Sequence, residues 1–114
     1  MSKSWEGEAT VFDVNAALDF SEGGIVSKTL YAGDDARVVL FGFDAGQELT
    51  EHTAAVPALL HVLEGEGEID LAGEKHPVGP GFYTRMPAHL PHSVKATGRL
   101  ALLLVLLRSG KPKK

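Results

Sequence analysis

Short segments rich in β-branched and aromatic residues alternate with Gly, Pro and Asp turns along most of this 114-residue chain. Residues 36–43 (ARVVLFGF) are typical, and turn residues interrupt such segments about every 6 to 12 positions. The pattern predicts about eight to ten short strands and almost no helix. Chains with this spacing fold into an all-β sandwich or barrel.

The chain divides into three parts. Residues 1–24 are predicted to form an N-terminal arm, with a first short strand at 10–14 and a helical turn at 15–18. Residues 25–108 hold the remaining strands, the first of them at 25–32, and residues 109–114 form a basic C-terminal tail. A composition of 44% hydrophobic and 23% charged residues is typical of one globular domain.

Charge and composition exclude several classes of partner. A net charge of −4 argues against nucleic acid, whose binding domains usually carry a basic face. The longest apolar run, 100–107, is far shorter than the ~20 residues of a membrane-spanning helix, so we expect no membrane partner. The polar start has no signal-peptide pattern, and we therefore expect a cytoplasmic protein. Without cysteine, a metal ion could bind only to histidine, carboxylate or backbone oxygen.

Two stretches combine a histidine with Gly and Pro turns, at residues 46–67 and 81–92. Together they resemble the two signature motifs of the cupin superfamily. The resemblance covers residues 25–108 and extends to the VLEGEGEI hairpin and the MPA-x-x-PH corner, which small bacterial cupins commonly share. It implies a cupin-type jelly-roll β-barrel, also called a double-stranded β-helix.

Half of the family's metal ligands are absent from the first motif. Gly46, His52 and Gly65 stand at the family's spacing, but Ala54 replaces the second histidine of the motif and Ala58 replaces its glutamate. The resemblance implies that His52 faces the barrel interior. Alternation along the strand places Glu51 and Thr53 on the face opposite to His52.

The second motif keeps its histidine but not all of its other positions. Gly81, Pro87 and His92 match, whereas His89 replaces a glycine and Ala96 an asparagine. We expect His92 to lie near His52, with His89 at the barrel rim. A catalytic mononuclear site uses three protein ligands and an open position, so these two histidines alone leave it incomplete.

His61 is the candidate for a third ligand, and the sequence leaves its orientation open. If Glu64 faces water, strict alternation turns His61 inward. The family pattern instead turns position 58 inward and His61 outward, to pack or to meet another subunit. Both patterns hold only if the strand contains a β-bulge, for which Gly65 is a plausible place.

A pocket wall is expected around this pair of histidines. The run at 100–107 has no polar side and is predicted to be buried on both faces. Tyr83 and Arg85 share a strand face near His92 and are candidates for polar contacts to a ligand. The predicted pocket residues are Leu60, Tyr83, Arg85, Leu104 and Leu106, with Phe41 and Phe43 in the core or wall.

The resemblance implies a small-molecule site inside the barrel. One hypothesis adds a divalent metal (Fe, Mn, Ni, Cu or Zn) on His52 and His92, with dioxygenase-like or isomerase-like chemistry. The alternative is a metal-free ligand-binding or sensing barrel without catalysis, so enzymatic activity stays open at this point. The resemblance also implies a homodimer, formed by strand exchange or sheet packing, in which the N-terminal arm could take part.

Overall fold

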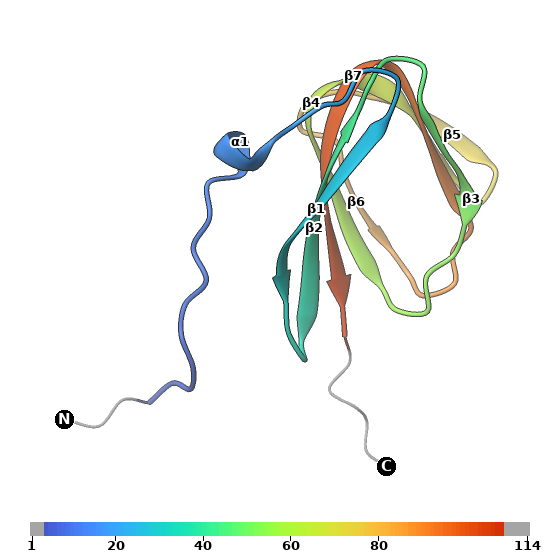
Figure 1. Cartoon of the computed structure of the whole chain (residues 1–114). Helices are drawn as coiled ribbons and strands as arrows, with labels where there is room; N and C mark the ends of the chain where they lie inside the picture. Colours follow the sequence, from blue (N-terminus) through green and yellow to red (C-terminus); the bar gives the residue numbers. More distant parts are fainter. Residues whose placement is uncertain (1–3, 109–114) are drawn as a thin grey trace.

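The computed structural model describes residues 4–108 (Figure 1), so the basic tail at 109–114 lies outside the described part. One short helix, α1 (Val14–Ala17), precedes seven strands. They are β1 (Ile25–Ala32), β2 (Ala36–Phe43), β3 (Glu48–His52), β4 (Ala58–Leu71), β5 (Glu74–Val78), β6 (Tyr83–Met86) and β7 (His92–Leu107). The all-β prediction is confirmed. Within residues 4–108, no helix is long and apolar enough to cross a bilayer.

The strands are fewer and longer than the sequence predicted. Segments expected as separate strands are continuous in β4 and in β7, because bulges bend these strands without ending them. The strand predicted at 10–14 is wrong. Residues 10–13 form no strand, and the Asp13 side chain accepts a hydrogen bond from the Ala16 N–H (3.2 Å), which caps α1.

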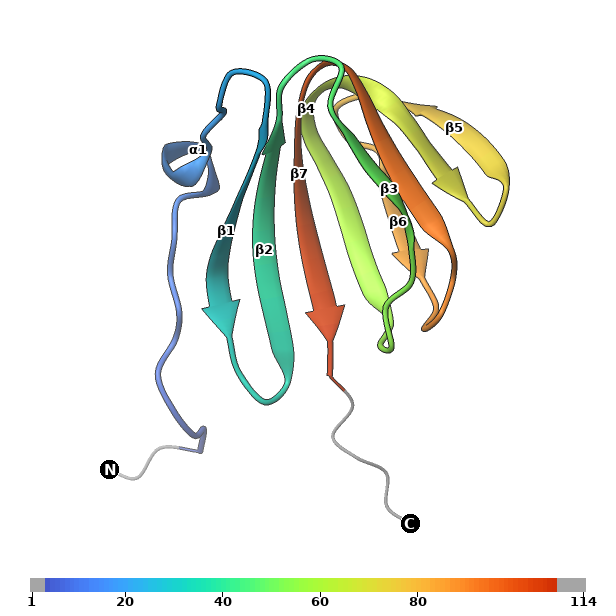
Figure 2. The ribbon, with the colours of Figure 1, turned by 45° about the vertical axis from the view of Figure 1, so that its right-hand side comes forward.

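The two long strands run through both layers of a folded-over sheet (Figures 1 and 2). In one layer the first half of β4 pairs with the second half of β7, and β2, β1 and β6 extend it. In the other layer the second half of β4 pairs with the first half of β7, flanked by β5 and β3. No pairing joins β1 to β5 in residues 4–108, so the sheet is not closed.

A bulge in β4 reverses which residues of this strand face the core. Before it Leu60 and Val62 are buried, and after it Gly67 and Ile69 are buried, so the inward parity changes from even to odd. The register with β7 shifts between Val62 and Glu64 and again between Gly65 and Gly67. The predicted bulge near Gly65 is therefore confirmed, and it reconciles an exposed Glu64 with an inward position 58.

The segment before β1 is fastened to the outer side of the sheet. Lys28 Nζ donates to the Ala17 carbonyl (2.8 Å), and the Gly23 N–H donates to Asp44 Oδ2 (2.7 Å). The Arg99 guanidinium lies 5.1 Å from the centre of the Phe20 ring and also bonds Asp44. The arm ahead of α1 runs away from these contacts (Figure 1), with Trp5, Val11 and Phe12 exposed.

Candidate functional site

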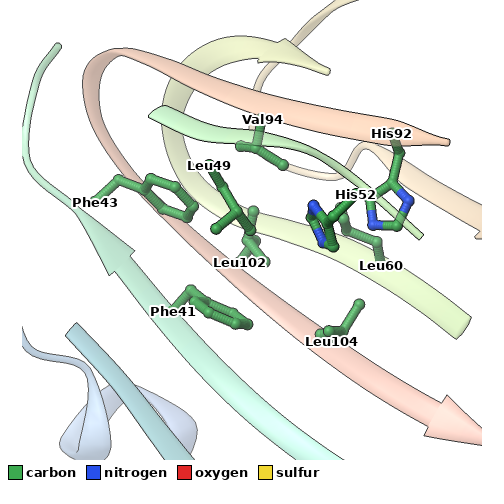
Figure 3. Close-up of a pocket in the computed structure, with 9 residues that line it drawn as sticks. All are labelled: Phe41, Phe43, Leu49, His52, Leu60, His92, Val94, Leu102 and Leu104. Atoms are coloured by element: carbon green, nitrogen blue, oxygen red, sulfur yellow. The ribbon is translucent and has the colours of Figure 1, made fainter. Parts of the chain in front are cut away.

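A small pocket lies between the two layers, on the inner faces of the strands (Figure 3). Its cavity of about 50 Å³ has room for a few water molecules or part of a small organic molecule. In the layer that contains β1 and β2, the wall comes from β2, the first half of β4 and the second half of β7; in the other layer it comes from β3 and the first half of β7. The lining residues are Phe41, Phe43, Leu49, His52, Leu60, His92, Val94, Leu102 and Leu104.

His52 and His92 form the polar end of this pocket. They are direct cross-strand partners on β3 and β7, and their ring centroids are 4.2 Å apart with an interplanar angle of 57°. His92 is 7% exposed, whereas His52 is exposed and marks the open side of the pocket. Figure 3 shows the two rings side by side at one end of the apolar wall.

A bulge in β3 places His52 in the pocket. Leu49 pairs with Val94 and His52 pairs with His92, so β3 advances three residues while β7 advances two. In a regular strand, residues three apart point to opposite faces, and Leu49 and His52 could not both line one cavity. No feature of the amino-acid pattern indicates this irregularity.

Both imidazoles are oriented by backbone carbonyls. His52 Nδ1 lies 2.8 Å from the Thr50 carbonyl oxygen, and His92 Nδ1 lies 2.9 Å from that of Leu90. A carbonyl oxygen only accepts hydrogen bonds, so Nδ1 is the donor in each ring. In the neutral ring, Nε2 then carries a free lone pair. This arrangement is the one by which proteins orient a histidine for a ligand or metal ion.

The donor set does not fit a catalytic metal centre with three protein ligands. Within residues 4–108, no group of three or more His, Cys, Asp or Glu side chains could hold a metal ion. Ala58, at the family's glutamate position, is 3% exposed and brings only a methyl group to the core. Glu48 and Glu51 are exposed outside the pocket lining. Two imidazole nitrogens remain, and the other coordination positions would need water or ligand atoms.

His61 lies on the outer face of β4, away from the pocket. Its neighbours Leu60 and Val62 are buried inward, so alternation turns His61 outward. Its ring packs edge-on against Tyr83, with centroids 5.9 Å apart at 72°. The open question about its orientation is thus answered in favour of the family pattern, and His61 does not join the other two histidines.

Tyr83 and Arg85, which we expected in the pocket wall, do not line it. On β6 the alternate residues Thr84 and Met86 pair with the inward-facing Leu60 and Ala58, and this register turns Tyr83 and Arg85 outward. Tyr83 is 58% exposed. The expectation assumed the opposite parity for this short strand.

Leu60 and Leu104 lie in the wall, whereas Leu106 does not line the pocket. Leu106 lies two residues beyond Leu104, toward the end of the sheet, where it packs against the buried core. Leu49, Val94 and Leu102 were not predicted, and they complete the wall. Val94 and Leu102 each lie two residues from a predicted residue on the same strand, so alternation was the signal that could have found them.

Comparison with known proteins agrees with this architecture. The family model described as "Cupin domain" matches residues 39–107. A conserved protein of unknown function from Streptococcus pyogenes is 28% identical, with a TM-score of 0.79 and 93% of each chain covered. A cupin superfamily protein from Desulfitobacterium hafniense is 24% identical, with a TM-score of 0.79, over 94% of this chain and 97% of that one. No curated protein matches.

A salicylate 1,2-dioxygenase from Pseudaminobacter salicylatoxidans shares the fold as well. It is 21% identical, with a TM-score of 0.67, and the match covers 74% of this chain but 26% of that enzyme. This similarity concerns the fold alone. The predicted jelly-roll fold is confirmed, and the family match over more than half of its length shows that the chain belongs to the cupin family.

Proposed function

We propose that this cupin binds a small organic molecule in the interior pocket, with His52 and His92 as the groups that hold its polar end. One observation carries the proposal: two imidazoles, each held by a backbone carbonyl through Nδ1, lie together at one end of an apolar cavity. Apolar walls with a few placed polar groups are typical of small-molecule sites.

A thermal-shift screen of a small-molecule library tests this proposal. Compounds that bind the pocket should raise the melting temperature of the wild-type chain, because a ligand that binds only the folded state stabilises it. The shift should shrink in His52→Ala and stay unchanged in His61→Ala, whose ring lies on the outer face. Shifts of equal size in His52→Ala and in the wild type would place the binding elsewhere and contradict the proposal.

A divalent metal ion on the same pair is the second candidate. Carbonyl-oriented imidazoles with free Nε2 atoms favour it, and the absent third ligand among residues 4–108 argues against tight binding. A bound metal would supply Lewis-acid or oxygen-activating chemistry for a dioxygenase-like or isomerase-like reaction. Elemental analysis of protein purified without chelator, then incubated with Fe(II), Mn, Ni, Cu or Zn, tests this. Metal that is retained in His52→Ala or His92→Ala would exclude this pair as its site.

We also propose a homodimer formed through the outer face of the layer that contains β1 and β2. Leu102 and Leu104 face the pocket, so the residues between and after them, Leu103 and Val105, face outward, where they are partly exposed. Apolar side chains on an uncovered sheet face favour a partner. The exposed Trp5 and Val11 of the arm offer further apolar contacts. Light scattering coupled to size exclusion should give twice the 12.1 kDa chain mass, and a monomer mass would reject the proposal.

The three-part division of the chain and its cytoplasmic location stay predictions. Limited proteolysis tests the first of these, since cleavage confined to residues 1–24 and 109–114 would leave a resistant core.

A further inference from the structure

The wall of the pocket is apolar except for the histidine pair. Phe41 and Phe43 contribute two phenyl rings with centroids 6.1 Å apart, and aliphatic side chains complete the lining. An apolar cavity of about 150 Å³ is known to bind benzene, so this smaller space of about 50 Å³ receives at most part of one ring. A ligand of about one ring in size would fill it and reach the open side at His52.

The polar end of the pocket offers hydrogen-bond acceptors, so a ligand must supply the donor. The Nδ1–H of each ring is already committed to the carbonyl of Thr50 or Leu90. The two Nε2 atoms of the neutral rings are therefore acceptors, on rings only 4.2 Å apart. A hydroxyl group brings the proton that one of these atoms needs. A carboxylate brings only acceptors and leaves both nitrogens without a partner.

The charges around the pocket also disfavour an anion. Within the described part of the chain, no Lys or Arg lines the cavity. Arg37 shares the inner face of β2, but it lies four residues from Phe41, ~13 Å along the strand, and donates to Thr29 Oγ1 at 3.2 Å. A carboxylate or phosphate in this wall would lose its hydration without gaining a cation, which is strongly unfavourable.

From these three features we infer that the pocket takes an uncharged, mainly apolar molecule of about one ring in size that carries a hydroxyl group, and that it excludes carboxylates and phosphates. This inference rests on the proposed small-molecule function and adds the chemical class of the ligand. The apolar wall determines the shape of the ligand and contacts its ring. His52 and His92 distinguish ligands with similar rings, because they accept a hydrogen bond from a hydroxyl group.

Three probes of equal ring size separate the contributions: phenol has a hydroxyl, toluene has none, and benzoate carries a charge. Binding of each probe to the full chain is measured by calorimetric titration at pH 8. Chelator treatment beforehand removes any metal ion, so that only the imidazoles contact the polar group of the probe. Phenol should bind about 3- to 10-fold more tightly than toluene, the ratio expected for one hydrogen bond. Benzoate should bind at least ~100-fold more weakly than phenol, because its charge has no partner in the wall.

Variants assign the effect to the pocket. Leu104→Trp fills the cavity and should abolish binding of phenol and toluene alike. The double variant His52→Ala/His92→Ala should bring the phenol-to-toluene ratio close to one, because neither acceptor nitrogen remains. The two single variants show which nitrogen accepts the hydroxyl proton, and His52 is exposed, so folding is less at risk there. His61→Ala is the matched control, since its ring packs on Tyr83 outside the cavity, and it should leave all three affinities unchanged.

Each contrary result has its own meaning. Benzoate that binds as well as phenol overturns the ligand class but leaves the small-molecule function in place. Equal binding of phenol and toluene overturns the role of the hydroxyl group. If none of the three probes binds, the inference fails, and the proposed function is then judged separately by library compounds whose shift depends on His52.

Discussion

The carbonyl oxygen of Arg99 occupies the place where a β-carbon on Gly65 would lie. Gly65 also has φ +91°, a region that side chains rarely adopt. Both properties belong to the bulged stretch of β4, where the strand passes from one layer of the sheet to the other. A glycine at this position therefore allows one strand to serve both layers and to reverse its inward parity.

Gly65→Ala should destabilise the fold strongly, by roughly 2–5 kcal/mol, since backbone strain and a collision with main-chain atoms add. Gly73→Ala is the matched control: its φ is +93°, but nothing lies within 4 Å of its added β-carbon. Strain alone should cost about 1–2 kcal/mol there. Urea unfolding measures both, and equal losses would show that the close approach to Arg99 is unimportant.

Asp44 should make the stability of the fold depend on pH. Hydrogen bonds from the Gly23 and Ala45 N–H groups, together with Arg99, hold the pKa of Asp44 below its ordinary value. A lowered folded pKa means that the carboxylate stabilises the fold above the unfolded value of ~3.9, and that this contribution is lost as the pH falls through the folded pKa.

Asp44→Asn should therefore lower the melting temperature at pH 7, and the difference from wild type should shrink below pH 4. Asp34→Asn, in the exposed turn after β1, serves as the control and should change stability by less than about 0.5 kcal/mol. Thermal melts between pH 2 and 7 measure the effect. A difference that stays constant over this range would contradict the assignment.

Val105→Lys should convert the proposed dimer into a monomer. Val105 faces away from the pocket on β7, so a lysine there places a charge in the proposed interface without entering the core. Circular dichroism should stay as in the wild type while light scattering reports half the mass. Glu66→Lys, at an exposed position on β4, controls for the added charge. A Val105→Lys dimer would show that the subunits meet elsewhere.

Much of the fold could be predicted because turn residues and β-patterns are local signals. Both ends of β1 and of β2 fall where the sequence places them, and the bulge near Gly65 followed from the conflict between two inward parities. The family resemblance brought His52 and His92 together. What failed depends on parity in short strands: four-residue β6 carries no alternation of its own, so the orientation of Tyr83 and Arg85 comes from its pairing with β4.

The bulge in β3 and the carbonyl partners of the two rings could not be predicted for a similar reason. They depend on the register with β7 and on backbone geometry, which composition and spacing do not encode. These are also the features that give the site its chemistry, because they decide which nitrogen of each imidazole is free. A strict alternation, as the sequence suggests, would have turned Leu49 and His52 to opposite faces.

The position of the proton on each of these two rings tests the proposed site most directly. Nitrogen-15 NMR of the labelled full chain at pH 8, assigned with His52→Ala and His92→Ala, identifies the nitrogen that carries the proton in each neutral ring. We predict protonated Nδ1 and free Nε2 in both histidines, and a shift of both Nε2 signals, but not that of His61, when phenol is added. A proton on Nε2 of either ring in the free protein would show that this pair does not offer two acceptors to a ligand.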